Sequence, residues 1–463
     1  MSCNNGTSSS LPGLTVHISA QGQFDQCMGA PCCTFFSTAV PRLHHYALGD
    51  VYQSIQGTLG FGNTVTINLD RVADLIGAVN LRYTLLPWTE NAGVAGDFDA
   101  SDIANAYAYT NAIGYFGIDY AELLVGGTVL DRLTGDTLYI MDQFLRPEGL
   151  QAGRMVGDYP TYLDRMEKAR FNQDILVPLT FGPFRPDREA HWLPSVAIYK
   201  QRIELKMCMR PLAQLIHTEG TGSTAYDAGL VNAADVNAIL PNGGSNNLSN
   251  VHLQQWVVLL TQPERKRLPA HESNPTYTIY SQWHTKGQTF DIPAGQATGT
   301  QRSSINNYME AFFLVPRLRS KWNLVLGTAT ARGYEWTNFE GSDVNMTGPA
   351  PGTPIPAAQP ALACVRFQLN SQERVNASWI NFTDFMPWFA GPRNPANGIG
   401  MYSFSARVHT PHASGGLNMS MIDHQDWTLT KFNAADDLFV EPYYLCRQIA
   451  EQHSGIHRPM FTS

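Results

Sequence analysis

Three histidines and a carboxylate near the C-terminal end form the cluster in the sequence whose residue types and spacing best suit metal chemistry. His409, His412 and His424 follow one another closely, and Asp423 precedes the last of them. Three imidazoles and a carboxylate beside a β-hairpin could bind a transition metal, as in jelly-roll metalloenzymes. However, His409 falls on the polar face of a predicted strand, and His412 follows Pro411 in a turn. Solvated histidines of a strand edge and its turns explain the pattern more simply.

A second group of possible metal ligands lies near the N-terminus. Cys27, Cys32 and Cys33 are followed by His44 and His45. This spacing fits no standard zinc pattern, so we predict ordinary buried or surface thiols. The seven cysteines of the chain are an odd number scattered over its length. That distribution is typical of reduced thiols rather than of a disulfide framework.

Sequence motifs of common enzymes are missing. His271-Glu272 begins like the helix of a zinc protease, but the position of the second histidine is Pro275. Proline supplies no ligand and disrupts a helix. The sequence also lacks a phosphate-binding loop, a G-x-S-x-G elbow and a strand-flanked G-x-G-x-x-G. We therefore predict no catalytic, cofactor-binding or metal-binding residues, and a chain that is not an enzyme.

Composition limits the partners of the chain. The 463 residues carry a net charge of −8, and only 15% are charged, while 11% are aromatic. Aromatic enrichment with few charges favours strands and large protein contact surfaces. The densest basic stretch, Glu264 to Arg267, is short, so we predict no direct contact with nucleic acid. No apolar run approaches the ~18–20 residues that span a bilayer, and residues 1–20 do not resemble a signal peptide.

The candidate histidines lie in a stretch that reads as two strands. From Gly398 onward, apolar residues alternate with polar ones, which predicts a half-buried strand. A turn-rich break follows at Pro411 to Gly416, and a second alternating run ends at Asp423. The pattern predicts a hairpin. Its predicted inward residues are Tyr402, Phe404, Ala406 and Val408, and its predicted outward residues are Ser403, Ser405, Arg407 and His409.

The rest of the chain repeats short strands separated by turn signals, with helices confined to loops. We expect short surface helices at Asp131 to Phe144 and at Tyr162 to Phe171, and long polar loops at 89–110, 210–250 and 341–360. Such a pattern predicts an all-β chain of sandwiches or jelly rolls. The predicted domains are a flexible arm at 1–13, a first jelly roll at 14–215, a connecting loop at 216–250 and a second jelly roll at 251–463.

Seven stretches in order resemble one protein family. They contain, among other features, an alternating strand followed by Arg-x-x-Asp-Leu, a Gly-Gly turn with Asp131 at an acidic position, a strand that ends in Glu-Arg, and a Tyr-Ser-Phe strand near the C-terminus. The stretches are Pro31 to Leu48, Phe61 to Pro87, Asn111 to Leu145, Ile175 to Leu205, Trp256 to Pro269, Met309 to Val315 and Phe382 to Ile422. In these features the chain resembles the double jelly-roll major capsid proteins of nucleocytoplasmic large DNA viruses, such as iridoviruses, phycodnaviruses and marseilleviruses.

The resemblance implies two consecutive eight-stranded antiparallel jelly rolls and a structural role. Such chains form homotrimers, pseudo-hexagonal capsomers that tile an icosahedral shell. Their implied partners are neighbouring capsomers, minor capsid proteins and an internal membrane, and their implied location is the virion, with assembly in the host cytoplasm. Loops could carry glycans at the six sequons, whose asparagines are Asn5, Asn247, Asn345, Asn376, Asn381 and Asn418.

Two other functions stay open at this point. One is a jelly-roll metalloenzyme or glycan-active protein that uses His409, His412 and His424. The other is a minor or penton component of a capsid.

Overall fold

The computed structural model describes most of the chain beyond the N-terminal segment. Met1–Tyr46 and Ala47–Ser463 are separate units, and the elements below belong to the second, with Tyr46 as the first residue of β1. The predicted arm at 1–13 lies outside the described residues. These are residues 46–460 apart from 56, 88–107, 147–151, 160–161, 185–191, 218–247, 267–274, 285–288, 320–335, 338, 340, 342–358, 396–397 and 411–413.

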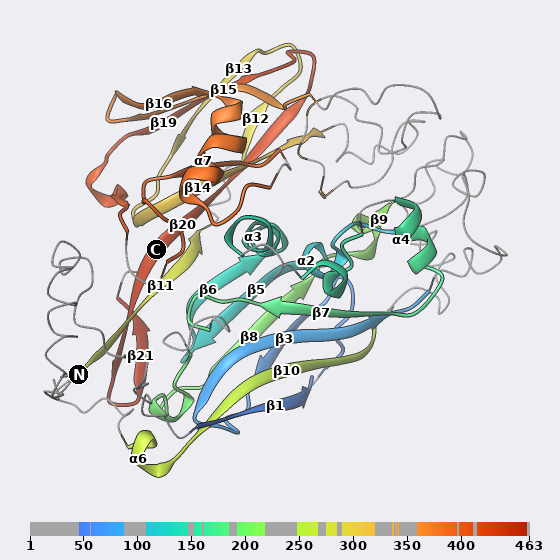
Figure 1. Cartoon of the computed structure of the whole chain (residues 1–463), viewed down its shortest axis with the longest axis vertical. Coiled ribbons are helices and arrows are strands. Elements are labelled where there is room, and N and C mark those ends of the chain that lie inside the picture. Colours follow the sequence, from blue (N-terminus) through green and yellow to red (C-terminus); the bar gives the residue numbers. More distant parts are fainter. Residues whose placement is uncertain are drawn as a thin grey trace, which may run out of the picture. The chain divides into compact units, whose positions relative to one another are not determined.

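Eight strands of the N-terminal half form two four-stranded antiparallel sheets (Figure 1). The first sheet has the order β1 (Tyr46–Ser54), β10 (Leu248–Leu260), β3 (Leu75–Leu85) and β7 (Gln173–Leu179). The second has the order β2 (Thr64–Asn68), β8 (Ile203–Met209), β5 (Ile118–Val125) and β6 (Thr128–Thr134). Numbered along the chain, these strands have the orders 1-8-3-6 and 2-7-4-5. That arrangement is a jelly roll.

The C-terminal half repeats this topology. One sheet contains, in order, β11 (Thr276–His284), β20 (Leu438–His453), β14 (Tyr308–Leu318) and β17 (Gly400–Ser403). The facing sheet contains β13 (Thr298–Ser303), β19 (Gln425–Lys431), β15 (Leu362–Leu369) and β16 (Gln372–Ser378). The orders are again 1-8-3-6 and 2-7-4-5. Three short strands extend the first of these sheets, namely β12 (Phe290–Ile292), β18 (Leu417–Asn418) and β21 (Ile456–Pro459). The predicted all-β fold of two antiparallel jelly rolls is confirmed.

The strand β10 joins the two halves of the sequence. Leu253 pairs with Leu81 of β3, and Gln255 pairs with Val79. As the eighth strand, β10 completes the first jelly roll, whereas the predicted division places residues 251–463 in the second. We propose a division after Leu260 instead.

Local patterns explain most strands. Val65 and Ile67 of β2 are buried and the residues between them are exposed, as the alternation predicts. Gly126 and Gly127 both have positive φ (60° and 82°), which suits the predicted tight hairpin turn between β5 and β6. β14 is buried along almost its whole length because both faces of its sheet are covered.

Helical segments lie between the strands, and one of them differs from its prediction. We expected a surface helix from Asp131 to Phe144. Instead β6 extends to Thr134, and every residue from Gly135 to Leu145 is buried. A capping box between Thr134 and Thr137 starts this helix. The helical segments are α2 (Ile113–Phe116), α3 (Gly135–Ile140), η4 (Met141–Leu145), η5 (Gly153–Val156), α4 (Tyr162–Lys168), η7 (Ser195–Ala197), η8 (Leu212–Gln214), α6 (Gln262–Arg265), η11 (Asn381–Phe385), α7 (Met386–Ala390) and η12 (Met419–Met421).

The predicted C-terminal hairpin is wrong. β17 pairs with Ala311 to Leu314 of β14, and β18 pairs with Tyr308 and Met309 of the same strand. The two strands therefore follow one another along one edge of β14 instead of pairing with each other, and an isolated antiparallel bridge joins Ser405 and Gly415 between them. Ser403 and Ser405, expected in solvent, are buried because the sheet is covered on both faces. The Ser403 hydroxyl donates to the Ser405 carbonyl (2.7 Å), which satisfies it there.

Candidate functional site: the contact between the two jelly rolls

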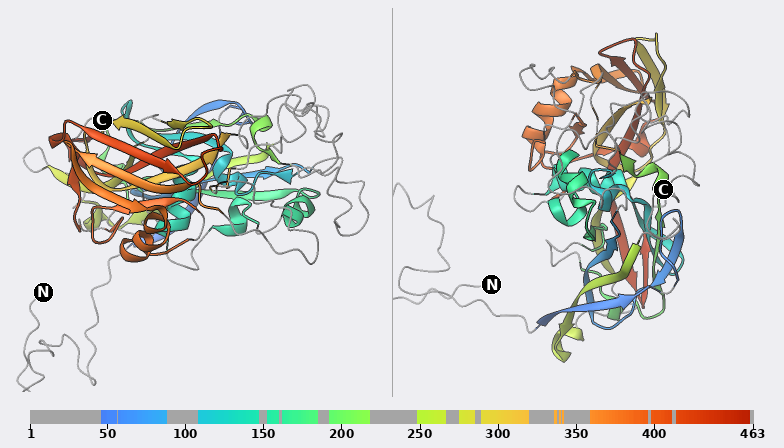
Figure 2. Two further views of the ribbon diagram at one scale, coloured as in Figure 1. Left: turned by 90° about the horizontal axis from the view of Figure 1, so that it is seen from above. Right: turned by 90° about the vertical axis from the view of Figure 1, so that its right-hand side faces the viewer.

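The second jelly roll lays one sheet over the helical segment α3 and η4 of the first (Figures 1 and 2). The ring of Phe144, in η4, meets the ring of Phe313, in β14, at 5.4 Å between centroids. Trp283 of β11 packs against the same Phe313 ring at 5.5 Å. These side chains belong to one continuous core cluster that crosses from roll to roll. A continuous buried apolar cluster of this kind favours a fixed position of one jelly roll against the other.

A charged cluster lies inside this apolar contact. The fully buried Arg317 guanidinium of β14 forms an ion pair with Asp136 of α3 and a second one with Glu441 of β20 (2.5 Å). Asp136 also faces Arg210 at 3.8 Å, just after β8. The cluster therefore joins two elements of each roll through charge-assisted hydrogen bonds, which are stronger than neutral ones.

Aromatic rings close the charged cluster. The Arg210 guanidinium lies 3.7 Å from the centre of the Trp336 ring, which is a cation–π contact. Trp336 in turn donates its indole N–H to the carbonyl of Gln214 (2.8 Å) and stacks on Phe116. Residues near 336 and 214 are distant in sequence, so this contact also ties the second roll to the first.

The electrostatics of the cluster follow from its burial. Burial alone would raise the pKa of Asp136, but the charges of Arg317 and Arg210 outweigh it and hold the pKa below its ordinary value. Burial raises the pKa of Glu441, and the negative charge of Asp136 raises it further. The positive charge of Arg317 lowers it, but by less than the other two raise it. For Tyr443, burial and the two carboxylates raise the pKa well above its ordinary value. The cluster is thus arranged to keep Asp136 and Arg317 charged.

A second buried carboxylate lies close to the contact. Asp131 of β6 accepts hydrogen bonds from the backbone N–H groups of Gly182 (2.8 Å) and Arg132 (2.9 Å). Burial raises its pKa to about 7, and backbone hydrogen bonds, including one from Trp283 of β11, lower it less. Nearby, the Tyr280 hydroxyl donates to the Leu130 carbonyl (3.2 Å). Asp131 therefore helps to hold β6 against β11.

The backbones of the first roll and of β11 approach closely at Gly182. A Cβ atom at this position would lie 2.3 Å from the Ser281 carbonyl oxygen and 2.6 Å from the Tyr280 ring. Any side chain here would push the turn at 181–184 away from β11. This glycine is required by space rather than by its backbone angles.

The candidate histidines do not form one site among the described residues. His409 is buried with φ of 61°, and its backbone N–H donates to Glu310 (2.7 Å), which is paired with Arg447 (3.0 Å). His424 is exposed, and its backbone N–H donates to the Asn370 side chain (3.0 Å). His412 lies outside the described residues. Burial of His409 contradicts the expected solvated histidine, because His409 and Thr410 both contact the Glu310–Arg447 pair.

Other candidate features have ordinary surroundings. In the part of the chain that the structure describes, no three His, Cys, Asp or Glu side chains are grouped so that they could hold a metal ion. Cys208, Cys364 and Cys446 are free thiols. The N-terminal cysteine and histidine group and the His271-Glu272 pair lie outside the described residues. Among the described helices, none has the length and apolar character needed to cross a bilayer.

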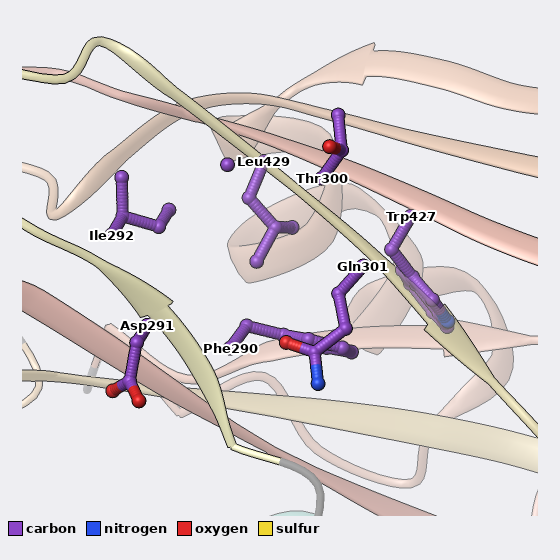
Figure 3. Close-up of a pocket in the computed structure, with 8 residues that line it drawn as sticks. Phe290, Asp291, Ile292, Thr300, Gln301, Trp427 and Leu429 are labelled. Atoms are coloured by element: carbon purple, nitrogen blue, oxygen red, sulfur yellow. The ribbon is translucent and has the colours of Figure 1, made fainter.

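Figure 3 shows a small hollow in the second jelly roll. It has a volume of about 10 Å³ and lies between β12, β13 and β19. Asp291 at its rim is held by Arg319 (2.6 Å). Its lining combines apolar side chains with few polar ones: Phe290, Asp291, Ile292, Gly299, Thr300, Gln301, Trp427 and Leu429. Its size and its lining are those of a packing gap between sheet edges.

Three of the six sequons lie in the described part of the chain. Asn376 is in β16, Asn381 is in η11 and Asn418 is in β18. These three asparagines therefore lie in strands or a helical segment rather than in loops. Asn376 and Asn418 are exposed, whereas Asn381 is half-buried. The other three asparagines lie outside the described residues.

The charged residues of the contact escaped the sequence analysis. Arg317 lies near the end of the strand YMEAFFLVPRL, whose only other charged residue is Glu310. A charge inside such a run predicts a buried partner, because an unpaired buried charge is very costly. That signal could have marked Arg317, but nothing local identifies Asp136 as its partner.

The chain matches known capsid proteins. Residues 34–241 match the family described as the major capsid protein N-terminus. The chain is 25% identical over 202 residues to a probable capsid protein of Acanthamoeba polyphaga mimivirus; that match covers 43% of this chain and only 38% of the relative. It is 23% identical to the major capsid protein of Paramecium bursaria Chlorella virus 1, with 90% of this chain and 87% of the relative covered.

The fold agrees with these matches. A capsid structure of PBCV-1 superimposes with a TM-score of 0.68 and 17% identity, covering 93% of this chain and 100% of that one. A similarity at this level of identity concerns the fold, and that fold is the double jelly roll described above. With the family match and the relatives, it supports assigning the chain to the major capsid proteins of nucleocytoplasmic large DNA viruses.

Proposed function

We propose that the chain is a structural subunit of a virus capsid, which forms homotrimers that act as pseudo-hexagonal capsomers of an icosahedral shell. The observation that carries this proposal is the identical strand order of the two jelly rolls, together with a similarity to a major capsid protein over 90% of the chain. A chain with two equivalent blocks can build a six-sided outline from three copies.

The contact between the rolls suits this role. A capsomer needs blocks that keep a constant angle, and the buried Arg317–Asp136 pair with its aromatic surround supplies a directional contact. Apolar packing alone is less directional. Weak contacts between trimers would then be multiplied in a closed lattice.

The remaining partners follow from the same role. Neighbouring capsomers would surround each trimer, with minor capsid proteins and an internal membrane on the inner side. The subunits would assemble in the host cytoplasm, and their final location would be the capsid of the virion. They would make no direct contact with nucleic acid, which fits the net charge of −8. The exposed Asn376 and Asn418 are the described sequons best placed to carry glycans.

Mass measurement and imaging test the proposal. Light scattering of the purified chain should give three times the chain mass of 51.2 kDa, and electron microscopy should show particles with a six-sided outline. A chain that stays monomeric at high concentration would refute it. Metal analysis of the same sample tests the metalloenzyme alternative, which requires zinc or iron in proportion to the protein.

A further inference from the structure

Both jelly rolls carry a helix directly after their fifth strand. In the first roll β6 ends at Thr134 and the helix runs from Gly135 to Leu145. In the second roll β16 ends at Ser378, and helical backbone runs from Trp379 to Ala390 through η11 and α7. The two helices therefore occupy the same place in the two strand orders.

The two equivalent helices differ in what covers them. The helix of the first roll is buried along its whole length, because the sheet β11-β20-β14-β17 lies over it. The helix of the second roll is buried on one face by Phe382, Met386 and Ala390. Its other face is open.

The open face of the second helix is aromatic. Trp388 is 70% exposed and Phe389 is 60% exposed, with Phe385 and Ile380 also exposed beside them. The rings of Phe385 and Phe389 stack at 6.1 Å, so the side chains form one patch. We call these four residues the α7 patch. Contiguous exposed aromatic side chains mark interaction sites.

The sheet that corresponds to the covering sheet is open in the first roll. Its order β1-β10-β3-β7 matches β11-β20-β14-β17 strand for strand. On its outer face the Tyr52 ring contacts His252 at 5.5 Å, and Gln254 lies on the same side, while Leu253 points into the core. Trp256, which follows Gln254 at the strand period, is 45% exposed, and Leu48 and Tyr52 are each 56% exposed. We call Leu48, Tyr52 and Trp256 the β10 patch.

The two patches cannot reach one another within one chain. In the views of Figures 1 and 2, α7 and the strands β1 and β10 lie at opposite ends of the described elements. Each chain thus contains one completed contact between a helix and a sheet. It also presents the two surfaces of a second such contact, the α7 patch and the β10 patch, which do not meet within the chain.

We propose that the α7 patch of one copy packs on the β10 patch of the next copy, and so repeats between chains the contact that joins the two rolls within a chain. This inference rests on the proposed function and names the surfaces through which the trimer closes. Such a contact is heterologous, with different surfaces on the two partners, as a ring requires. A lipid membrane is the alternative partner to which an exposed patch of Trp and Phe side chains could bind.

Two variants at exposed positions test the assignment without disturbing the core. Trp388→Ser should leave the thermal unfolding midpoint of the subunit nearly unchanged. It should raise the dissociation constant of the trimer at least ~30-fold, as truncation of an interface hot spot does. Phe171→Ser, at a 60% exposed aromatic outside both patches, is the matched control and should leave the trimer intact.

A photoreactive phenylalanine analogue at position 388 tests the partner surface directly. Irradiation of the trimer should give covalent dimers on a denaturing gel, joined to peptides from 46–54 or 248–260. Cross-links to other peptides, or a Trp388→Ser variant that trimerises like the wild type, would overturn the inference while the trimeric capsomer stands. A trimer unaffected by Trp388→Ser, with lost flotation on anionic vesicles, would assign the patch to lipid. A wild-type chain that never trimerises would instead refute the proposed function.

Discussion

Asp136 and Arg317 come from different jelly rolls, yet their side chains form an ion pair that is almost completely buried. Asp136 lies in the helix after the fifth strand of the first roll, and Arg317 lies near the end of the third strand of the second. Because water cannot replace either partner there, this pair couples the folding of one roll to the position of the other.

Removing one partner of this pair should be strongly destabilising. Arg317→Met leaves the Asp136 and Glu441 carboxylates without their shared cation, and we expect the free energy of unfolding to fall by about 3–5 kcal/mol. Denaturant unfolding of the purified chain measures this. The double variant Asp136→Asn/Arg317→Met should lose clearly less than the sum of the two single variants, because the pair is coupled.

An exposed ion pair provides the control. Arg302 and Asp426 are 2.9 Å apart, but their side chains are 61% and 35% exposed. Arg302→Met should therefore cost less than about 1 kcal/mol. Equal costs at Arg302 and Arg317 would mean that burial does not decide the strength of the pair.

Gly182→Ala should destabilise the contact between the turn at 181–184 and β11. The added methyl group would lie 2.3 Å from the Ser281 carbonyl oxygen, so the backbone must shift, at an expected cost of about 1–3 kcal/mol. Gly49→Ala is the matched control, because its Cβ would meet only the Val257 side chain at 3.8 Å. We expect that control to change the thermal midpoint little, and a similar drop in both variants would count against the close approach.

Asp131 should make the chain more stable in mild acid. Its pKa is about 7 when folded and 3.8 in its ordinary state, so between these values the folded chain binds more protons than the unfolded chain. Stability should therefore rise as the pH falls from about 7 to about 4, by up to about 4 kcal/mol from this residue. Asp131→Asn should remove this contribution, so unfolding curves across this range should show the variant losing stability relative to the wild type as the pH falls. The same dependence of stability on pH in the variant and the wild type would show that Asp131 does not titrate there.

His457 should act in the opposite direction. It is buried in β21, its ring nitrogens have no hydrogen-bond partner among the described residues, and burial lowers its pKa from 6.5 to about 4. The folded chain then binds fewer protons than the unfolded chain, and stability should fall as the pH drops from about 6.5 to about 4, by about 3 kcal/mol.

The two residues are separable by mutation. In the wild type their slopes oppose one another and largely cancel between pH 4 and 6.5. His457→Gln should therefore expose the acid stabilisation by Asp131, and Asp131→Asn should expose the acid destabilisation by His457. Parallel unfolding curves for the two variants would contradict both assignments.

The sequence predicts the strands better than it predicts their neighbours. Alternation locates β2, and the apolar run at Leu75 locates β3, because these patterns are local. The pairing of Leu253 with Leu81 is not local, so the predicted boundary at residue 251 did not take it into account. Pairing across such a separation depends on tertiary contacts that no window of sequence contains.

The candidate site was hidden for a related reason. Asp136 and Asp142 give the helix after β6 the look of a surface helix, yet both are buried, Asp136 against Arg317 of the second roll and Asp142 against Ala152 of the first. Ser403 was likewise placed in solvent, since alternation assumes that one face of a sheet is wet. Both errors arise where one roll packs on the other, and the resemblance to capsid proteins could not supply those contacts.

The identical strand order of the two rolls has a consequence for size control. A joint that is repeated without change either returns to its starting point or winds into an open helix. If the contact between copies repeats the joint within the chain, the angle set around Arg317 and Asp136 also sets how many copies complete the circle. The number of copies in the ring would then be determined by the fold of the single subunit. A small error in that angle would yield open helices instead of closed capsomers.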